Sequence, residues 1–292
     1  MKKLLTLFFL SYVFITIGQD STTTFPKDTT WEKGGVIGLN FTQTSLSNWA
    51  GGGENAISGT SYASLYAKYA KKQTTWDNSL DLAYGLIKQG EGDLIKSDDR
   101  IEFSSKFGQY AFKKYWYYSA LLDFKTQFAE GYKLPNDSIR ISNFLAPAYI
   151  VLGLGMDYKP SKNFALLMAP VTGKMTIVND QTLANAGAFG VEAATYDDLG
   201  DVLIAGKQQR YEFGGFIKAS YLKKLRKDIL FSTKVELFSN YVENPENIDV
   251  NWQTLLTMKV TKFITVNFST HLIYDDDIDI VVDDETGRTG PR

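Results

Sequence analysis

The residues best suited to chemistry are one histidine and two groups of aspartates. His271 is the only histidine in the chain. Three aspartates follow it at positions 275–277, while Asp98 and Asp99 stand in another predicted loop. A His–Asp pair that faces an Asp pair across an opening can activate water by general-base catalysis. Hydrolysis is therefore the chemistry to consider first, and it requires a fold that brings both groups to one rim.

The acidic C-terminal stretch also offers oxygen ligands that suit calcium. Asp275, Asp277 and Asp279 alternate there with other residues, and Ca²⁺ prefers carboxylate oxygens. The EF-hand pattern is not met, because no glycine stands at the sixth loop position and Thr286 stands at the twelfth. We expect no resident metal, no cofactor and no catalytic residue, and these aspartates remain the calcium candidate.

The elements that position these groups are predicted to be β-strands, because the chain divides into segments in which apolar and polar residues alternate. From Trp116 to Phe128 every second residue is apolar except Thr126, and the residues between include Asp123 and Lys125. Each segment reaches at least about the 9–11 residues that a tilted membrane strand requires. The predicted strands are Gly35–Gln43, Ile57–Ala70, Thr75–Ile87, Arg100–Ala111, Tyr115–Phe128, Phe144–Tyr158, Phe164–Ile177, Gln209–Leu222, Ile229–Tyr241, Asp249–Val260 and Phe263–Tyr274.

The alternation assigns an apolar face to lipid and a polar face to the interior of a barrel. A charge at mid-depth on the lipid face would cost about 2–4 kcal/mol, whereas an interior charge can find a partner. The inward charges nearly balance, which favours an interior crossed by ion pairs over a strongly selective pore. This predicted polar network comprises Asp77, Asp81, Glu102, Lys106, Asp123, Lys125, Arg210, Glu212, Lys218, Lys234, Glu236 and His271.

Aromatic residues of the outward register gather at the two ends of the strands. Two aromatic rings separated by an aliphatic band are typical of barrels that span a bilayer. One predicted ring comprises Trp76, Trp116, Tyr158 and Tyr221, and the other Tyr84, Tyr211, Tyr241, Trp252 and Tyr274. The connections also alternate between short turns and longer loops, and the longest runs from Val178 to Gln208. That loop could plug the interior, offer a docking surface or stay mobile.

The N-terminus has the layout of a cleaved secretory signal peptide. Two lysines precede an uncharged run, Leu4–Ile17, and small residues precede a cut before Gln19. We expect residues 1–18 to be the signal, 19–34 a periplasmic segment, 35–274 the barrel and 275–292 an acidic loop or tail. The chain has no cysteine and a net charge of −2, which gives no disulfide framework, no thiolate metal site and no sign of nucleic-acid binding.

Two features conflict with a regular barrel. Single-chain bacterial barrels have even strand numbers, whereas the segments number eleven, so a twelfth strand must come from Asp201–Ala205 or from residues before Gly35, or the last strand is missing from this sequence. We favour the missing strand. Pro147 and Pro170 fall inside predicted central strands, where we expect bulges.

Several stretches resemble one family: NWAGGGENAISG from Asn48, SDDRIE from Ser97, TQFAEGY from Thr126, FLAPAY from Phe144, APVTGKMTIVND from Ala169, LANAGAFGV from Leu183, NIDVNW from Asn247 and YDDD from Tyr274. The chain resembles, from about Trp31 to Asp277, the Bacteroidota proteins catalogued as domain of unknown function 3078. The resemblance implies an outer-membrane-associated β protein and brings no established activity or cofactor.

We therefore expect an all-β protein, an antiparallel outer-membrane β-barrel of about 12 strands. Its expected role is non-enzymatic, either as a narrow conduit for a solute or ligand or as a membrane scaffold. Partners would be outer-membrane lipid and, through the long extracellular loops, a protein. Two alternatives stay open: a rim protease of the omptin type built on His271 and the aspartates, and a soluble secreted β-sandwich that binds a ligand.

Overall fold

The computed structural model describes residues 30–46, 53–133, 139–261 and 264–275. They form one 11-stranded antiparallel sheet in which neighbours along the chain are neighbours in space. The all-β, antiparallel class is thus confirmed, and each predicted segment matches one strand. In sheet order the strands are β1 (Trp31–Thr44), β2 (Ala56–Lys71), β3 (Thr74–Gln89), β4 (Leu94–Tyr110), β5 (Trp116–Thr126), β8 (Ala148–Ser161), β9 (Phe164–Ile177), β12 (Gln209–Arg226), β13 (Ile229–Asn240), β14 (Ile248–Lys259) and β15 (Thr265–Tyr274).

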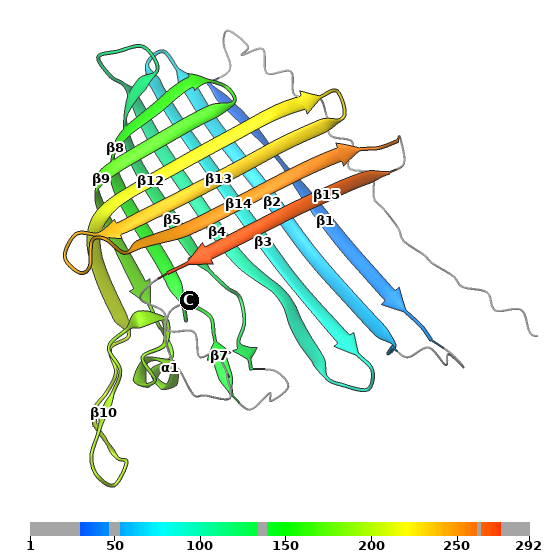
Figure 1. The fold of residues 1–292 in the computed structure, drawn as a ribbon, viewed down its shortest axis with the longest axis vertical. Coiled ribbons are helices and arrows are strands. Elements are labelled where there is room, and N and C mark those ends of the chain that lie inside the picture. The colour runs from blue at the N-terminus through cyan, green and yellow to red at the C-terminus, as the bar shows by residue number, and fades with distance from the viewer. Residues whose placement is uncertain (1–29, 47–52, 134–138, 262–263, 276–292) are drawn as a thin grey trace, which may run out of the picture.

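The sheet curls so that its second half lies in front of its first half (Figure 1). β1 and β15 are its two edges, and in the described residues neither pairs with the other. Because eleven antiparallel strands alternate in direction, these two edge strands run the same way. The structure therefore shows a curled sheet with two free edges and no closed barrel.

One internal candidate for a twelfth strand of the sheet, Asp201–Ala205, is wrong, and the other, the residues before Gly35, is described only from residue 30. Val202–Ile204 forms β11, but it pairs only with β10 (Thr195–Tyr196) in a separate hairpin. Residues before Gly35 extend β1 back to Trp31 and form no strand of their own in the described part. The expected boundary at residue 35 accordingly moves to Trp31, while the predicted signal and nearly all of the acidic tail lie outside the described residues.

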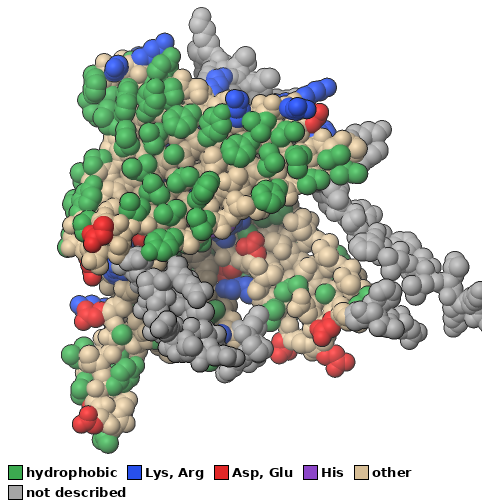
Figure 2. Space-filling model, in the orientation of Figure 1, with side chains coloured by type: hydrophobic (Ala, Val, Ile, Leu, Met, Phe, Trp, Pro, Cys, Tyr) green, Lys and Arg blue, Asp and Glu red, His purple; other side chains and the backbone are tan. Residues whose placement is uncertain are grey.

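The register gives the curled sheet an apolar outer face and a polar inner face. Residues directly opposite one another in neighbouring strands share a face, so the pairing of Trp76 with Phe107 and of Asp77 with Lys106 separates the two sets as predicted. In the outward register, β5, β9, β13, β14 and β15 carry no charged residue. Figure 2 shows hydrophobic side chains spread over this outer surface.

One of the two expected bulges is present. On β9 an additional residue lies between Ala169 and Thr172, opposite a single residue of β12 and of β8, so Pro170 sits in an interruption of both ladders. Pro170 has no N–H to donate, and a bulge removes the need for one. The expected bulge at Pro147 is wrong, because β8 begins after it, at Ala148.

The remaining elements are short and belong to the long loops. β6 (Gly131–Tyr132) pairs with β7 (Arg140–Ser142), and the longest connection contains α1 (Gln181–Asn185), η1 (Ala188–Gly190) and the β10–β11 hairpin. None of the helices in the described ranges is long and apolar enough to cross a membrane.

The bulge allows a matched test of packing with two glycines. A Cβ at Gly155 would lie 1.9 Å from the backbone oxygen of Met168, whereas a Cβ at Gly173 would meet nothing within 4 Å. We expect Gly155→Ala to lower the free energy of unfolding by about 1–3 kcal/mol, because the adjoining strands must separate. Gly173→Ala should leave it unchanged within about 0.5 kcal/mol. Urea unfolding of both variants measures the difference, and equal values would contradict the close approach at the bulge.

Candidate functional site

Ion pairs cross the interior and connect strands that are distant in the sheet. Lys125 of β5 binds Glu236 of β13 at 2.8 Å, and Asp123 of β5 binds Lys218 of β12 at 2.8 Å. β8 and β9 lie between these partners in the sheet, together with β12 for the first pair. Only a tightly curled sheet brings such side chains together, so these pairs span a narrow interior.

Glu236 is the centre of this group. Its carboxylate is nearly buried and also meets Lys218 at 3.2 Å and Lys234 at 3.3 Å. The amide of Asn251 donates to it at 3.3 Å. Removing a carboxylate from water is costly unless several opposite charges and donors compensate. Here three lysines and one amide do so.

A second group lies toward the short turns. Asp157, whose side chain is 1% exposed, binds Lys106 at 2.6 Å and Lys159 at 3.2 Å. Lys159 also reaches Asp77 at 3.0 Å. This group joins β3, β4 and β8 on the inner face.

A third group lies toward the long loops, around Lys174 of β9. Its ammonium binds Asp249 at 2.7 Å, Glu212 at 3.5 Å and Asp275 at 3.7 Å, and it lies 5.0 Å from the ring centre of Phe238. Arg210 contributes a further contact with Glu212 at 3.4 Å. The chain thus holds one of its own ammonium groups among three carboxylates and an aromatic ring.

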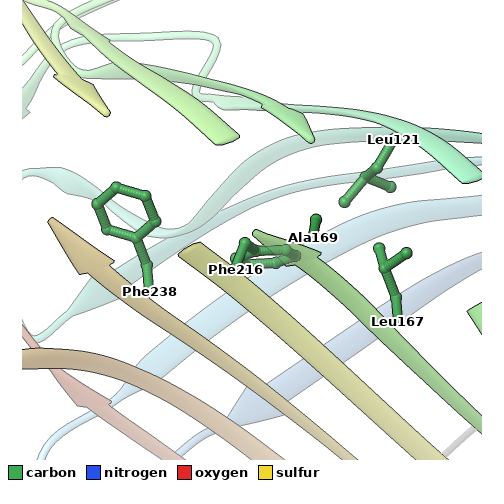
Figure 3. Close-up of a cluster of buried hydrophobic side chains, with 5 residues drawn as sticks. All are labelled: Leu121, Leu167, Ala169, Phe216 and Phe238. Atoms are coloured by element: carbon green, nitrogen blue, oxygen red, sulfur yellow. The ribbon is translucent and has the colours of Figure 1, made fainter. Parts of the chain in front are cut away.

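Apolar side chains fill the interior between these charged groups. Figure 3 shows them converging from β5, β9, β12 and β13. None is more than 6% exposed, and they pack beside the Glu236 group. They leave no wide passage along this side of the interior. The cluster consists of Leu121, Leu167, Ala169, Phe216 and Phe238.

Toward the long loops the interior opens into a chamber of about 530 Å³. Its floor includes Asp123, Glu236, Phe216 and Phe238, and its wall comes from β4, β5, β8, β9, β14 and β15. Figure 2 shows charged side chains in the hollow beneath β15. A concave site with aromatic surface and a few polar groups is the usual form of a small-molecule site.

The chamber wall carries acidic groups that its own cations do not neutralise. Among the described residues Glu102 and Asp98 have no ion-pair partner. Glu102 stands directly opposite Asp81 on β3 and Lys125 on β5, and Lys125 pairs with Glu236. Ser64 donates to Asp81 at 2.5 Å. Like charges placed opposite each other in a sheet are destabilising. On β4 the two carboxylates of Asp98 and Glu102 flank one cation, Arg100. This segment of the wall therefore carries more negative than positive charge.

His271, Asp98, Asp99 and Asp275 line one rim, and among the described residues His271 forms no pair with an aspartate. His271 Nε2 lies 2.9 Å from the amide oxygen of Asn251 and 3.5 Å from the amide nitrogen of Gln253. Asp99 accepts from the backbone N–H groups of Phe128 and Ala129 and pairs with Lys96. Its role is to hold the loop after β5 against β4, and it is not poised to activate water.

The calcium candidate is only partly described. Asp275 pairs with Lys174, while Asp277 and Asp279 lie outside the described residues. In the part of the chain that the structure describes, no group of three or more His, Cys, Asp or Glu side chains is placed to hold a metal ion.

Aromatic side chains form pairs at both ends of the outer face. Toward the short turns, Trp31 packs with Tyr69 and with Trp76 at ring distances of 5.3 and 5.8 Å. At the same end Trp116 meets Tyr158 and Tyr221 meets Phe231. Toward the long loops Tyr84 meets Phe128, and Phe213 meets Tyr241. Tyr211, Trp252 and Tyr274 of the predicted ring also lie on β12, β14 and β15 with partly or well exposed rings.

Two cations of the ion-pair groups, Lys159 and Lys174, are absent from the polar network predicted from the sequence. The strand predicted from Phe144 ends at Tyr158, which leaves Lys159 in the following turn, but β8 continues to Ser161. Lys174 follows the bulge at Pro170, which reverses the alternation for the rest of β9. Counting one additional residue at that proline would have turned Lys174 inward.

Residues 41–132 match the model of a family described as a protein of unknown function, DUF3078. This part of the chain, which begins within β1 and ends with β6, is similar to that family. The resemblance seen in the sequence is thereby confirmed over this stretch. No curated protein matches the chain.

The DUF3078 match ends before the longest loop, whose first half forms a compact support. Asp180 caps α1 by accepting from the N–H groups of Thr182 and Leu183 at 3.0 and 3.2 Å. Burial raises the pKa of Asp180, but these N–H groups, the Asn143 amide and the nearby Arg140 outweigh it, so the pKa lies below its ordinary value. The cap therefore stays ionised at neutral pH.

This support does not plug the interior. It packs around a second apolar cluster on the long-loop end, and Figure 1 shows α1 and the β10–β11 hairpin extending away from the curled sheet. The cluster consists of Ala146, Val178, Leu183, Ala184 and Val191.

The ion pairs at Glu236 give a direct test of what the interior contributes to stability. We expect Glu236→Gln to lower the free energy of unfolding by about 3–5 kcal/mol, because it leaves buried lysines without their shared counter-charge. Glu192→Gln is the matched control, since its pair with Lys207 is about two-thirds exposed on both sides and should contribute less than about 1 kcal/mol. Urea unfolding of the two variants provides the measurement. A small loss at Glu236 would mean that the crossing pairs do not hold the curl.

Proposed function

We propose that this protein spans an outer membrane as a β-barrel and binds a small cationic solute in its chamber. The support for membrane insertion is the combination of an outward register that carries no charge on β5, β9, β13, β14 and β15 with aromatic pairs at both strand ends. Lipid hydrocarbon accepts such a surface, and aromatic rings prefer the interfaces on either side of it.

The free edges set a condition on this proposal. Unpaired backbone groups cost several kcal/mol each in hydrocarbon, so neither β1 nor β15 can face lipid unpaired. Because these strands run in the same direction, an antiparallel closure needs an odd number of further strands between them. One strand makes the even total that such barrels use.

The chamber is the observation that carries the functional half of the proposal. It lies at the long-loop end, and its lining includes Asp123 and Glu236 together with Phe216 and Phe238 of the apolar cluster. A solute that enters from the long-loop side reaches acidic groups and aromatic rings. The three carboxylates and the ring around Lys174 illustrate how such a wall holds an ammonium group. A narrow, ligand-binding conduit fits these features better than a general diffusion pore.

The proposal includes export and a non-enzymatic role. Residues 1–18 have the layout of a signal peptide, and the resemblance to Bacteroidota proteins agrees with an outer membrane. His271 is held by amides of β14, and none of the described carboxylates contacts it in the way that would orient a general base. We therefore favour solute binding over hydrolysis.

A charge placed on the outer face tests the proposal that this face meets lipid. Leu154 lies at the middle of β8 and is 59% exposed. In liposomes we expect Leu154→Lys to lower the free energy of unfolding by about 2–4 kcal/mol, because the ammonium would lie in hydrocarbon. The measurement is urea unfolding of protein refolded into liposomes.

Ile57 provides the control for that substitution. It lies in the outward register near the long-loop end of β2, where Ile57→Lys should cost only about 0–1 kcal/mol. If Leu154→Lys costs no more than Ile57→Lys, the outer face meets water and the barrel proposal fails.

Binding of spermidine tests the chamber half. We expect saturable binding by calorimetry to the purified full chain in detergent, weakened about tenfold by Glu102→Gln because one unpaired carboxylate corresponds to roughly 1.4 kcal/mol. Asp93→Asn, in the exposed turn between β3 and β4, should leave the affinity unchanged. Citrate serves as the anionic counter-probe and should not bind. Equal binding of both compounds, or no effect of Glu102→Gln, would contradict a cation-selective chamber.

A further inference from the structure

The β10–β11 hairpin is the most isolated element of the described structure. Its two strands pair only with each other, and all five of their residues are exposed. Figure 1 shows it extending beyond the long-loop end of the sheet. Both of its edges therefore offer free backbone N–H and C=O groups.

The hairpin exposes far more apolar surface than an ordinary loop. Leu199 at its tip is 89% exposed, and Leu203 and Ile204 are 65% and 67% exposed. Tyr196 and Val202 add to the same surface, and Figure 2 shows hydrophobic side chains along the projection. Contiguous apolar surface of this kind marks interaction sites in folded proteins.

Its turn is built by specific hydrogen bonds. The carboxylate of Asp197 accepts from the N–H groups of Leu199 and Asp201 at 2.9 and 2.8 Å. Gly200 has φ +87°, a left-handed conformation that suits glycine. The tip therefore has a defined shape.

The base of the hairpin is attached firmly to α1. Asn185 accepts from the N–H of Gly206 at 2.9 Å, and its carbonyl accepts from the N–H of Ala194 at 3.0 Å. A Cβ at Gly206 would lie 2.2 Å from the carbonyl oxygen of Ala184, so the chain passes directly against the helix. An isolated two-stranded hairpin is at best marginally stable in water, and this support holds it out from the sheet.

Charge decides which partner fits. Asp197, Asp198 and Asp201 surround the tip, and residues 193–206 contain no lysine or arginine. Two copies that met tip to tip would bring six carboxylates together, and an anionic lipid surface would repel the hairpin as well. A surface that presents apolar side chains together with lysine or arginine complements it.

We propose that the β10–β11 hairpin is the docking site for a protein partner that adds a β-strand to one of its edges. The partner strand alternates apolar residues, which cover Leu203 and Ile204, with basic residues, which reach Asp198 and Asp201. Main-chain hydrogen bonds along the edge give affinity, and the alternating side chains give specificity.

A defined peptide probe tests this proposal. A labelled peptide of about nine residues that alternates lysine with valine is titrated against the purified full chain in detergent and followed by fluorescence anisotropy. A peptide of the same composition with the lysines grouped together carries the same charge without the strand pattern. We expect the alternating peptide to bind at least about tenfold more tightly, since only it can match the edge.

Two hairpin variants and one control separate docking from general attraction. Leu203→Ser with Ile204→Ser removes apolar contact, and Asp198→Asn with Asp201→Asn removes charge while it keeps the Asp197 turn. Each pair should weaken the alternating peptide by about fivefold or more. Glu91→Gln with Asp93→Asn neutralises another exposed acidic turn at the same end and should not change binding.

Other outcomes would overturn the proposal. Equal affinity of both peptides, or equal weakening by the control pair, would show that charge alone attracts them. Sedimentation of the full chain and flotation with anionic vesicles identify the other occupants. Loss of a dimer, or loss of vesicle binding, in the Leu203→Ser and Ile204→Ser variant would assign the hairpin to a second copy or to lipid.

Discussion

Ion pairs that cross the interior are the interaction on which the rest of the structure depends. Lys125 with Glu236 and Asp123 with Lys218 join the middle of the sheet to its second half. Without these ion pairs, nothing on the polar inner face would require a particular curvature of the sheet. With them, the buried charges require that the sheet stay curled, because separation would leave ammonium and carboxylate groups without compensation. The close approach of β5 to β12 and β13, and with it the narrow interior, follows from that requirement.

The strand pattern was predictable from the sequence because a period of two is a local property. All eleven strands and the two faces follow from it, and most residues of the ion-pair groups were identified by their inward register alone. The pattern fails where one additional residue interrupts it. At Pro170 the bulge reverses the alternation, and Lys174, the centre of the third ion-pair group, was missed for that reason.

Contacts between distant strands were not predictable in the same way. Sequence register shows that Lys125 and Glu236 both face inward, but nothing local shows that β5 reaches β13. The same limit applies to His271, whose neighbours Asn251 and Gln253 depend on the pairing of β14 with β15. The longest loop is a third case, since its order depends on Gln181 and Asn185 meeting Gly206 across the loop. Such contacts link residues whose separation in the chain carries no periodic signal.

The chamber and the β10–β11 hairpin, both at the long-loop end, keep their shapes by different interactions. Inside the curl, charged groups are compensated from several strands, so a chamber can keep a fixed shape while it presents a surplus of carboxylates at Asp98 and Glu102. Outside it, a projecting hairpin has no sheet to support it and must be held by a capped helix and a glycine contact at its base. The proposed solute recognition in the chamber and the proposed strand addition at the hairpin therefore depend on separate sets of interactions. Because the Glu236 group contacts no residue of the α1 support, a change in one site should leave the other intact.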